Sequence, residues 1–224
     1  MQPQQIAIII FQIAVFLFAI SVHESAHAWV AWRRGDPTAR MLGRISLNPI
    51  RHIDPVGTVV LPAIALFTGL PMIGWAKPVP VNPLNFRNHV LDDVLTSVAG
   101  PVSNFMVATA AVFAMALIAL LPGGRDAVPG VVAGYDTGSV WVPVVLFFYL
   151  SIHINVLLAI FNLIPVPPLD GSHVLRHFLS EPARRFYDTF GMVGLLALVL
   201  FGGRFLHVLI APVLGLFDSI LMRL

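Results

Sequence analysis

The chain has 224 residues, of which 58% are hydrophobic and 11% charged, and its formal net charge is +2. A soluble domain carries about 25% charged residues, so this composition, with a mean hydropathy of +0.87, predicts an integral membrane protein. The small net charge argues against a nucleic-acid partner, and the absence of cysteine excludes disulfides and thiolate metal ligands.

The first predicted element is a transmembrane helix over residues 6–32. It closes with two tryptophans and two arginines, Trp29, Trp32, Arg33 and Arg34. Aromatic residues followed by basic ones are typical of a span that reaches the membrane–water interface. A polar, arginine-rich loop follows over residues 33–55.

The next segment, residues 56–74, is apolar but does not read as a regular helix. It contains three residues that interrupt helices, Pro62, Gly69 and Pro71. It leads into GWAKPVPVNP, residues 74–83, whose prolines favour extended or edge-strand backbone.

Three later apolar stretches predict further spans, at residues 95–121, 141–164 and 189–222. The last of them is divided by Gly202, Gly203 and Arg204. It is therefore one bent helix or two short segments. We see no internal repeat, and the loops are short. The predicted fold class is an all-α integral membrane protein, a polytopic helical bundle in a single membrane-embedded domain, residues 1–224.

The first span carries the motif that points to chemistry. Within SVHESAHAWV, residues 21–30, His23, Glu24 and His27 match the pattern H-E-x-x-H. On a helix the two histidines lie on one face and can bind the same metal ion. Glu24, about 100° around the helix, can reach a water at that ion and act as a general base.

An alternative is that these polar side chains only hydrogen-bond to neighbouring helices. A chain with 8 histidines and two glutamates contains roughly 0.003 such motifs by chance. Placing a carboxylate and two imidazoles in an apolar span is also costly, which favours a functional site. The metal site is therefore the preferred interpretation.

A hydrolytic zinc site needs a third protein ligand and leaves a fourth position for water. No further histidine or glutamate follows the motif closely. Asp170 is the best candidate, because it lies in NLIPVPPLDG (162–171), where three prolines end the helix. From the residues alone, Asp170 could equally cap the helix that follows it.

HESAH in the first span, together with NLIPVPPLDG at the end of a later one, resembles the site-2 protease family of intramembrane zinc metalloproteases, peptidase family M50. The resemblance extends through NPIRHIDPVGT, GWAKPVPVNP and AGPVSN and covers most of residues 20–175. It is closest in pattern to the compact subgroup without a PDZ domain. It implies that His23, His27 and Asp170 bind one zinc ion per chain and that Glu24 is the general base.

The resemblance also implies roles for other residues. Asn104 and Asn162 would donate hydrogen bonds to the substrate backbone or the developing oxyanion, although interhelical hydrogen bonds explain both equally well. An edge strand from Pro78 to Pro83 would pair with unwound substrate and expose its scissile carbonyl. His52 would contact the metal ligands without binding the metal itself, or it would fix the loop in which it lies. His173, three residues after Asp170, could turn toward the metal, although the resemblance does not require a histidine at this position.

These observations predict an intramembrane zinc endopeptidase that cleaves within or near the transmembrane segments of other membrane proteins. The alternatives are a proteolytically silent metal-binding scaffold of the same fold and an ion- or proton-handling transporter. The intact Glu24 argues against the first, and the absence of repeated halves against the second. The expected partners are transmembrane substrates and the lipid bilayer, with no nucleic acid. The sequence gives no signal for an oligomeric state.

The metal site also predicts a membrane topology. His23 and His27 lie near the end of the first span, and Asp170 lies just past the 141–164 span. Both spans must therefore cross in the same direction, since Asp170 would otherwise lie about 30 Å away. Segment 56–74 is then a re-entrant or half-membrane segment. Basic residues concentrate in loops 33–55, 75–94 and 165–188, which predicts that the zinc lies in the cytoplasmic half of the bilayer. The expected location is a prokaryotic plasma membrane.

Single cysteines test this topology, because the native chain has none. Cysteines that replace Ser46, Asn85 or Ser180 should not react with a membrane-impermeant thiol reagent added to intact cells. A cysteine in place of Ser139 should react, because its loop faces outward. Labelling at position 85 from outside would contradict the topology and the metal site on which it depends.

Overall fold

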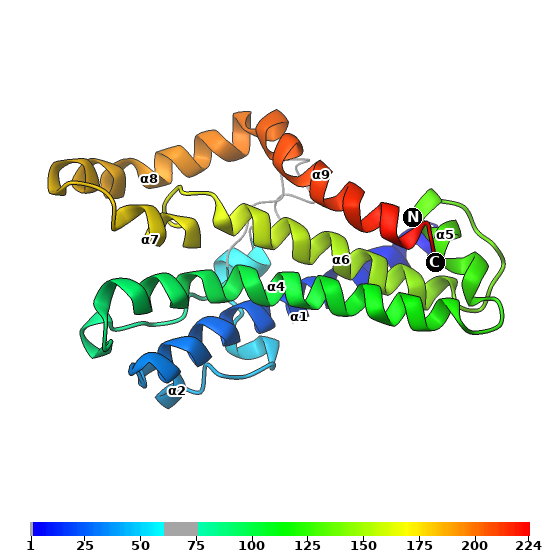
Figure 1. Cartoon of the computed structure of the whole chain (residues 1–224), viewed down its shortest axis with the longest axis horizontal. Helices are drawn as coiled ribbons and strands as arrows, with labels where there is room; N and C mark the ends of the chain where they lie inside the picture. Colours follow the sequence, from blue (N-terminus) through cyan, green and yellow to red (C-terminus); the bar gives the residue numbers. More distant parts are fainter. Residues whose placement is uncertain (1, 61–75) are drawn as a thin grey trace. The chain divides into compact units, whose positions relative to one another are not determined.

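The computed structural model describes residues 2–60 and 76–224. Their regular secondary structure is entirely helical, which confirms the all-α prediction (Figure 1). The elements are α1 (Pro3–Arg34), α2 (Thr38–Met41), η1 (Pro49–Arg51), η2 (Pro55–Val60), η3 (Pro83–Asn85), α4 (His89–Ala119), α5 (Gly124–Ala133), α6 (Val142–Leu163), α7 (Asp170–Arg176), α8 (Glu181–Phe201) and α9 (Gly203–Leu221).

Four helices in the described part are long and apolar enough to cross a membrane. They are Gln5–Arg34, His89–Ala119, Val142–Leu163 and Gly203–Leu221. Large apolar side chains on them remain exposed, such as Phe113 (69%) and Leu117 (66%), as expected for a surface that faces lipid. The chain is a polytopic helical membrane protein, and α1 and α6 closely match the predicted spans.

The second span begins earlier than predicted, at His89 instead of residue 95. Its first two turns include the polar residues His89, Asp92 and Asp93, and its beginning is capped. The Asn88 Oδ1 atom accepts from the Leu91 N–H (3.1 Å), and the Asp92 carboxylate accepts from the Asn88 N–H (2.8 Å). A search for apolar stretches cannot detect this turn, because capping and not hydrophobicity forms it.

The predicted span 189–222 is two helices, α8 and α9, separated at Gly202. The Gly202 N–H donates to the Leu198 carbonyl (2.8 Å) and closes the last turn of α8. Because α8 begins at Glu181 and its first half carries charged residues, only α9 meets the criteria for a span. The alternative with two segments is therefore correct.

Most of the predicted re-entrant segment 56–74, including Pro62, Gly69 and Pro71, lies outside the described residues, so it stays a prediction. Its first residues belong to η2, a short π-helix. Residues 76–82 form no strand within the described chain, so the expected edge strand is absent as a regular element.

The chain divides into two compact units. One comprises Met1–Ala19, Asn104–Ile160 and His207–Leu224, and the other comprises Ile20–Ser103 and Phe161–Leu206. The expectation of a single membrane-embedded domain stays a prediction.

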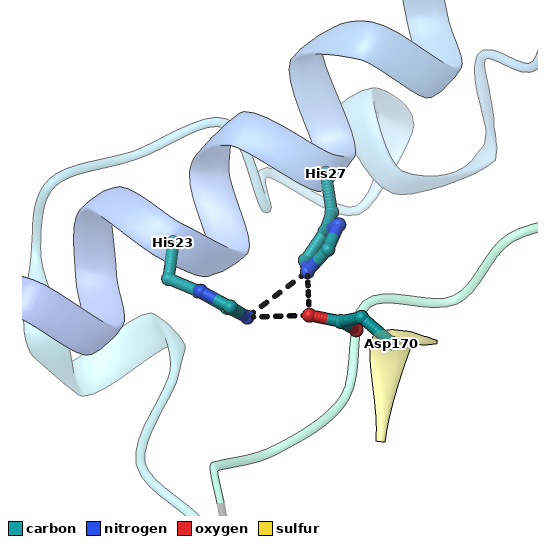
Figure 2. A group of neighbouring side chains, drawn as sticks. All are labelled: His23, His27 and Asp170. Atoms are coloured by element: carbon teal, nitrogen blue, oxygen red, sulfur yellow. Dashed lines mark hydrogen bonds and ion pairs between the residues drawn. The ribbon is translucent and has the colours of Figure 1, made fainter. Parts of the chain in front are cut away.

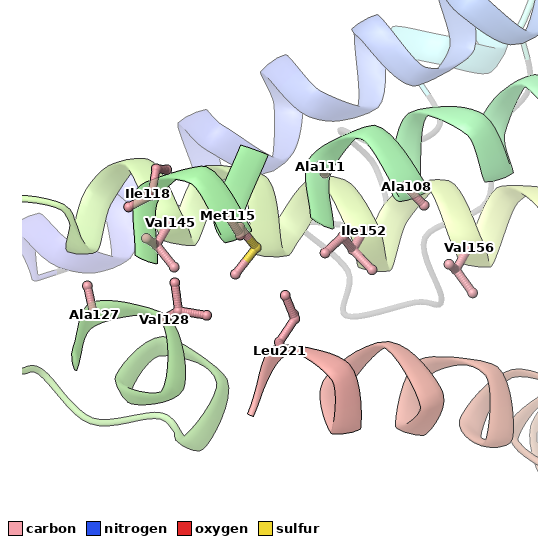
Figure 3. Close-up of a cluster of buried hydrophobic side chains, with 10 residues drawn as sticks. All are labelled: Ala108, Ala111, Met115, Ile118, Ala127, Val128, Val145, Ile152, Val156 and Leu221. Carbon is pink, nitrogen blue, oxygen red and sulfur yellow. The ribbon is translucent and has the colours of Figure 1, made fainter. Parts of the chain in front are cut away.

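The first unit is organised around a cluster of buried apolar side chains from α4, α5, α6 and α9 (Figure 3). Its members are Ala108, Ala111, Met115, Ile118, Ala127, Val128, Val145, Ile152, Val156 and Leu221. Beside it, the fully buried Asn104 amide donates to Asn155 Oδ1 on α6 (2.9 Å). This polar pair and the apolar cluster fix how α4 packs on α6 within this unit.

The second unit is held by buried charged groups in its loops. Asp36, just past α1, is fully buried and accepts from the Asn82 N–H (2.7 Å) and the Asn85 side-chain amide (2.8 Å). Buried Arg44 donates to the carbonyls of Arg51, Lys77 and Pro78. The proline-rich segment 77–82 is therefore anchored at both ends.

Candidate metal centre

Three side chains converge on one point, two from the helix α1 and one from the beginning of α7 (Figure 2). The Nε2 atoms of His23 and His27 lie 3.1 Å apart. The Asp170 Oδ2 atom lies 3.1 Å from His23 Nε2 and 3.3 Å from His27 Nε2. Both imidazoles are buried. Among the described residues, these three form the group that could hold a metal ion.

The spacing of these atoms fits zinc. Zinc bonds of about 2.0–2.1 Å to nitrogen and oxygen put tetrahedral ligands about 3.3–3.4 Å from one another. The three observed separations, 3.1, 3.1 and 3.3 Å, are close to these edges. The donor set, two imidazoles and one carboxylate, leaves one tetrahedral position for water or substrate.

The hydrogen bonds of the ligands support the same fit. His27 Nδ1 lies 2.6 Å from the Thr96 carbonyl, which can only accept, so Nδ1 carries a proton and Nε2 is the nitrogen that faces the centre and would bind a metal ion. The Asp170 Oδ2 atom is buried and makes no hydrogen bond within the described chain. Burial acts to raise the pKa of Asp170, but the neighbouring imidazoles hold it below its ordinary value, so the carboxylate is ionised.

Asp170 reaches the site through an irregular connection. The helix α6 ends at Leu163, and α7 begins at Asp170 after the proline-rich residues 165–168. A Cβ atom at Gly171 would lie against the Leu163 carbonyl, so the glycine allows close approach of the two backbones. The N-cap of α7 is Leu169 and no side chain caps it, so the alternative in which Asp170 only caps this helix is wrong.

Gly100 on α4 also adjoins the centre. A Cβ atom at this position would lie 2.6 Å from His23 Nε2 and would overlap His27 Nε2. The motif AGPVSN, residues 99–104, is part of the family resemblance, but the sequence alone does not explain why it contains a glycine. The structure explains it, because any side chain here would occupy the space of the ligand atoms.

Glu24 is half-buried beside the ligands. Its carboxylate has no hydrogen-bond or ion-pair partner within residues 2–60 and 76–224. Its charge acts on Arg44 and His52, which places both near it. A carboxylate that is not held by another group is available to accept a proton.

His52 lies in a network behind the motif. Its Nε2 atom donates to the Ser46 carbonyl (2.7 Å), which also accepts from the Ser25 hydroxyl (2.6 Å). The Ser46 N–H donates back to Ser25 Oγ (3.1 Å). Burial lowers the pKa of His52, which favours its neutral form. The network ties loop 44–52 to the helical turn between the two histidine ligands.

The other predicted residues lie elsewhere. His173 is half-exposed, and its Nδ1 atom lies 3.7 Å from Asp93, so it is not one of the three grouped ligands. Asn162 is half-buried in the last turn of α6. Asn104 belongs to the first unit, where its amide pairs with Asn155.

Comparison with known proteins identifies relatives. A family model described as Peptidase family M50 matches residues 11–202. YwhC of Bacillus subtilis is 36% identical over 174 residues, 78% of this chain and 71% of that protein. Rip2 of Mycobacterium tuberculosis is 30% identical over 202 residues, 87% of this chain and 70% of that protein. Rip2 of Mycolicibacterium smegmatis is 27% identical over 187 residues, and the match spans 61% of its length. All three names describe candidate zinc metalloproteases. No solved structure matches the chain significantly.

Gly100→Ala tests the geometry of the centre. The added methyl group displaces the two imidazoles, so zinc affinity should fall about tenfold or more. The measurement is the zinc content of detergent-purified protein, followed by competition with a chelator. Gly215→Ala is the matched control, because this helical glycine has open space around it. An unchanged zinc affinity in Gly100→Ala would contradict the proposed arrangement of ligands.

Proposed function

Because the chain belongs to peptidase family M50, a family of zinc metalloproteases, we propose that it hydrolyses peptide bonds within or near the transmembrane segments of other membrane proteins. One observation carries this proposal. The group formed by His23, His27 and Asp170 includes two residues of a helix that is apolar and long enough to cross a membrane. A hydrolytic centre built on such a helix is accessible to peptide bonds that soluble proteases cannot reach.

His23, His27 and Asp170 would hold one zinc ion per chain. When bound, zinc supplies Lewis-acid polarisation and makes water more acidic. Their own contribution is to fix the position of the ion: the Thr96 carbonyl orients His27, and the ionised Asp170 offsets part of the positive charge. The intact Glu24 supports an active protease over a silent metal-binding scaffold.

Glu24 would be the general base. Its carboxylate takes a proton from the attacking water as the water oxygen bonds to the scissile carbonyl carbon. The carbon–nitrogen bond then breaks as the same proton passes from Glu24 to the leaving amine. Its half-buried position next to His23 and the lack of a competing partner among the described residues support this role.

Substrate would bind in extended form. A peptide bond in a helix is shielded by the hydrogen bonds of the helix, so the chain must unwind before it is cut. Segment 77–82, anchored by Arg44 and Asp36, would pair with the unwound chain. Asn104 and Asn162 remain proposed donors to the substrate or oxyanion, and for Asn104 this requires the amide to leave Asn155.

The chain is a multi-pass membrane protein, and the lipid bilayer is its setting. We place it in a prokaryotic plasma membrane with its centre in the cytoplasmic half. The basic loops 33–55, 75–94 and 165–188 support this orientation. His52 would keep the loop behind Ser25 in place.

The substitution Glu24→Gln should leave zinc binding intact while it lowers the rate of peptide-bond cleavage. The amide keeps the shape of the side chain and leaves the three ligands intact, so the variant should retain zinc. Loss of the base should lower cleavage of single-span substrates in detergent by about 10²–10⁴-fold. The measurement is cleavage by gel together with zinc content. Cleavage near the native rate would remove Glu24 from the mechanism.

Asp170→Ala should lower zinc affinity itself, because it removes a carboxylate ligand. The measurement is zinc content after dialysis against a chelator, with Asp188→Ala as a control on the nearby helix. Protein that purifies with full zinc would show that another residue supplies the third ligand. His173→Ala, combined with Asp170→Ala, would then test the nearest imidazole.

A further inference from the structure

A second group of polar side chains joins α4 to the helix that carries Asp170. The His177 Nε2 atom lies 2.8 Å from Asp93 Oδ2, and the His173 Nδ1 atom lies 3.7 Å from Asp93 Oδ1. The Asp93 side chain is 16% exposed, whereas those of His177 and His173 are 23% and 46% exposed. All three belong to the same compact unit as the metal centre.

The helix α7 needs such contacts to hold its position. It has only 7 residues, Asp170–Arg176, and a helix this short is not stable in isolation. At its beginning, Gly171 packs on the backbone of Leu163. At its other end, about 10 Å away, His177 closes the last turn and reaches Asp93. Contacts at both ends therefore set where Asp170 points.

The same face of α4 also contacts the other ligands. Thr96, three residues after Asp93 and hence its neighbour on the helix surface, accepts from His27 Nδ1 through its carbonyl. The first turns of α4 thus orient a histidine of the motif and hold the short helix of the third ligand. The helix α4 therefore positions both the histidine motif and the short helix that carries Asp170.

We propose that Asp93 is a positioning residue for the metal centre. Its carboxylate accepts from His177, with a weaker contribution from His173, and holds α7 so that Asp170 meets His23 and His27. The inference rests on the proposed ligand set. The Asp93 carboxylate does not itself contact the metal or the substrate.

The test is zinc affinity of the full-length protein in detergent, measured by competition with a chromophoric chelator. Asp93→Ala and His177→Ala should each weaken zinc binding by about 10–100-fold. Asp93→Asn and His177→Gln keep an acceptor and a donor, so they should recover most of the affinity. Asp93→Ala combined with His177→Ala should be no weaker than Asp93→Ala alone, because Asp93→Ala already removes the contact with His177.

Asp188→Ala is the matched control. Asp188 pairs with Arg176 on the same short helix at 2.8 Å, but this pair is exposed and should not affect zinc binding. The inference is overturned if Asp93→Ala binds zinc like the native protein, if Asp188→Ala causes an equal loss, or if the double variant shows additive losses. It is also overturned if the native protein binds two zinc ions and Asp93→Ala binds one, since Asp93 would then be a ligand. If Asp170→Ala keeps full affinity, the ligand set itself fails, which is a distinguishable result.

Discussion

Two imidazoles and a carboxylate cannot rest against one another in an apolar setting unless a positive charge lies between them. If both rings are neutral and turn their Nε2 lone pairs to the carboxylate, a bound metal ion supplies that positive charge. Several features of the structure allow the three ligands to surround one ion. Gly100 leaves room beside the rings, Gly171 lets α7 approach α6, and the prolines before Asp170 release it from regular helix.

The parts of this arrangement that sequence could predict are local. The H-E-x-x-H spacing fixes two ligands because a helix repeats its faces at known intervals. Long apolar stretches located α1 and α6 closely. The residues around Asp170 did not by themselves identify it as a ligand, since helix capping explained this aspartate equally well. The family resemblance favoured it as a ligand, and the structure brings it to the two histidines.

The parts that sequence missed depend on long-range contacts or on backbone atoms. The Thr96 carbonyl orients His27, but every residue has a carbonyl, so no side chain signals this role. Asp36 and Arg44 are charged loop residues that read as solvent-exposed, yet both are buried by bonds to distant backbone. The interhelical bond of Asn104 was one of two alternatives, because an asparagine in a span serves either purpose.

The anchoring of segment 77–82 leaves few of its backbone groups available to pair with another strand. Proline restricts its own backbone and that of the preceding residue, so Pro78 and Pro80 keep the chain extended and offer no N–H. In extended chain, residues 78, 80 and 82 face one side, and there the Pro78 carbonyl and the Asn82 N–H are already bonded. Val79 and Val81 face the other side, about 7 Å apart, and on that side the N–H and carbonyl of Lys77 are already bonded to His52 and Arg44. A second strand can therefore pair with this segment only through the backbone groups of Val79 and Val81, and the flanking prolines limit how far such pairing extends.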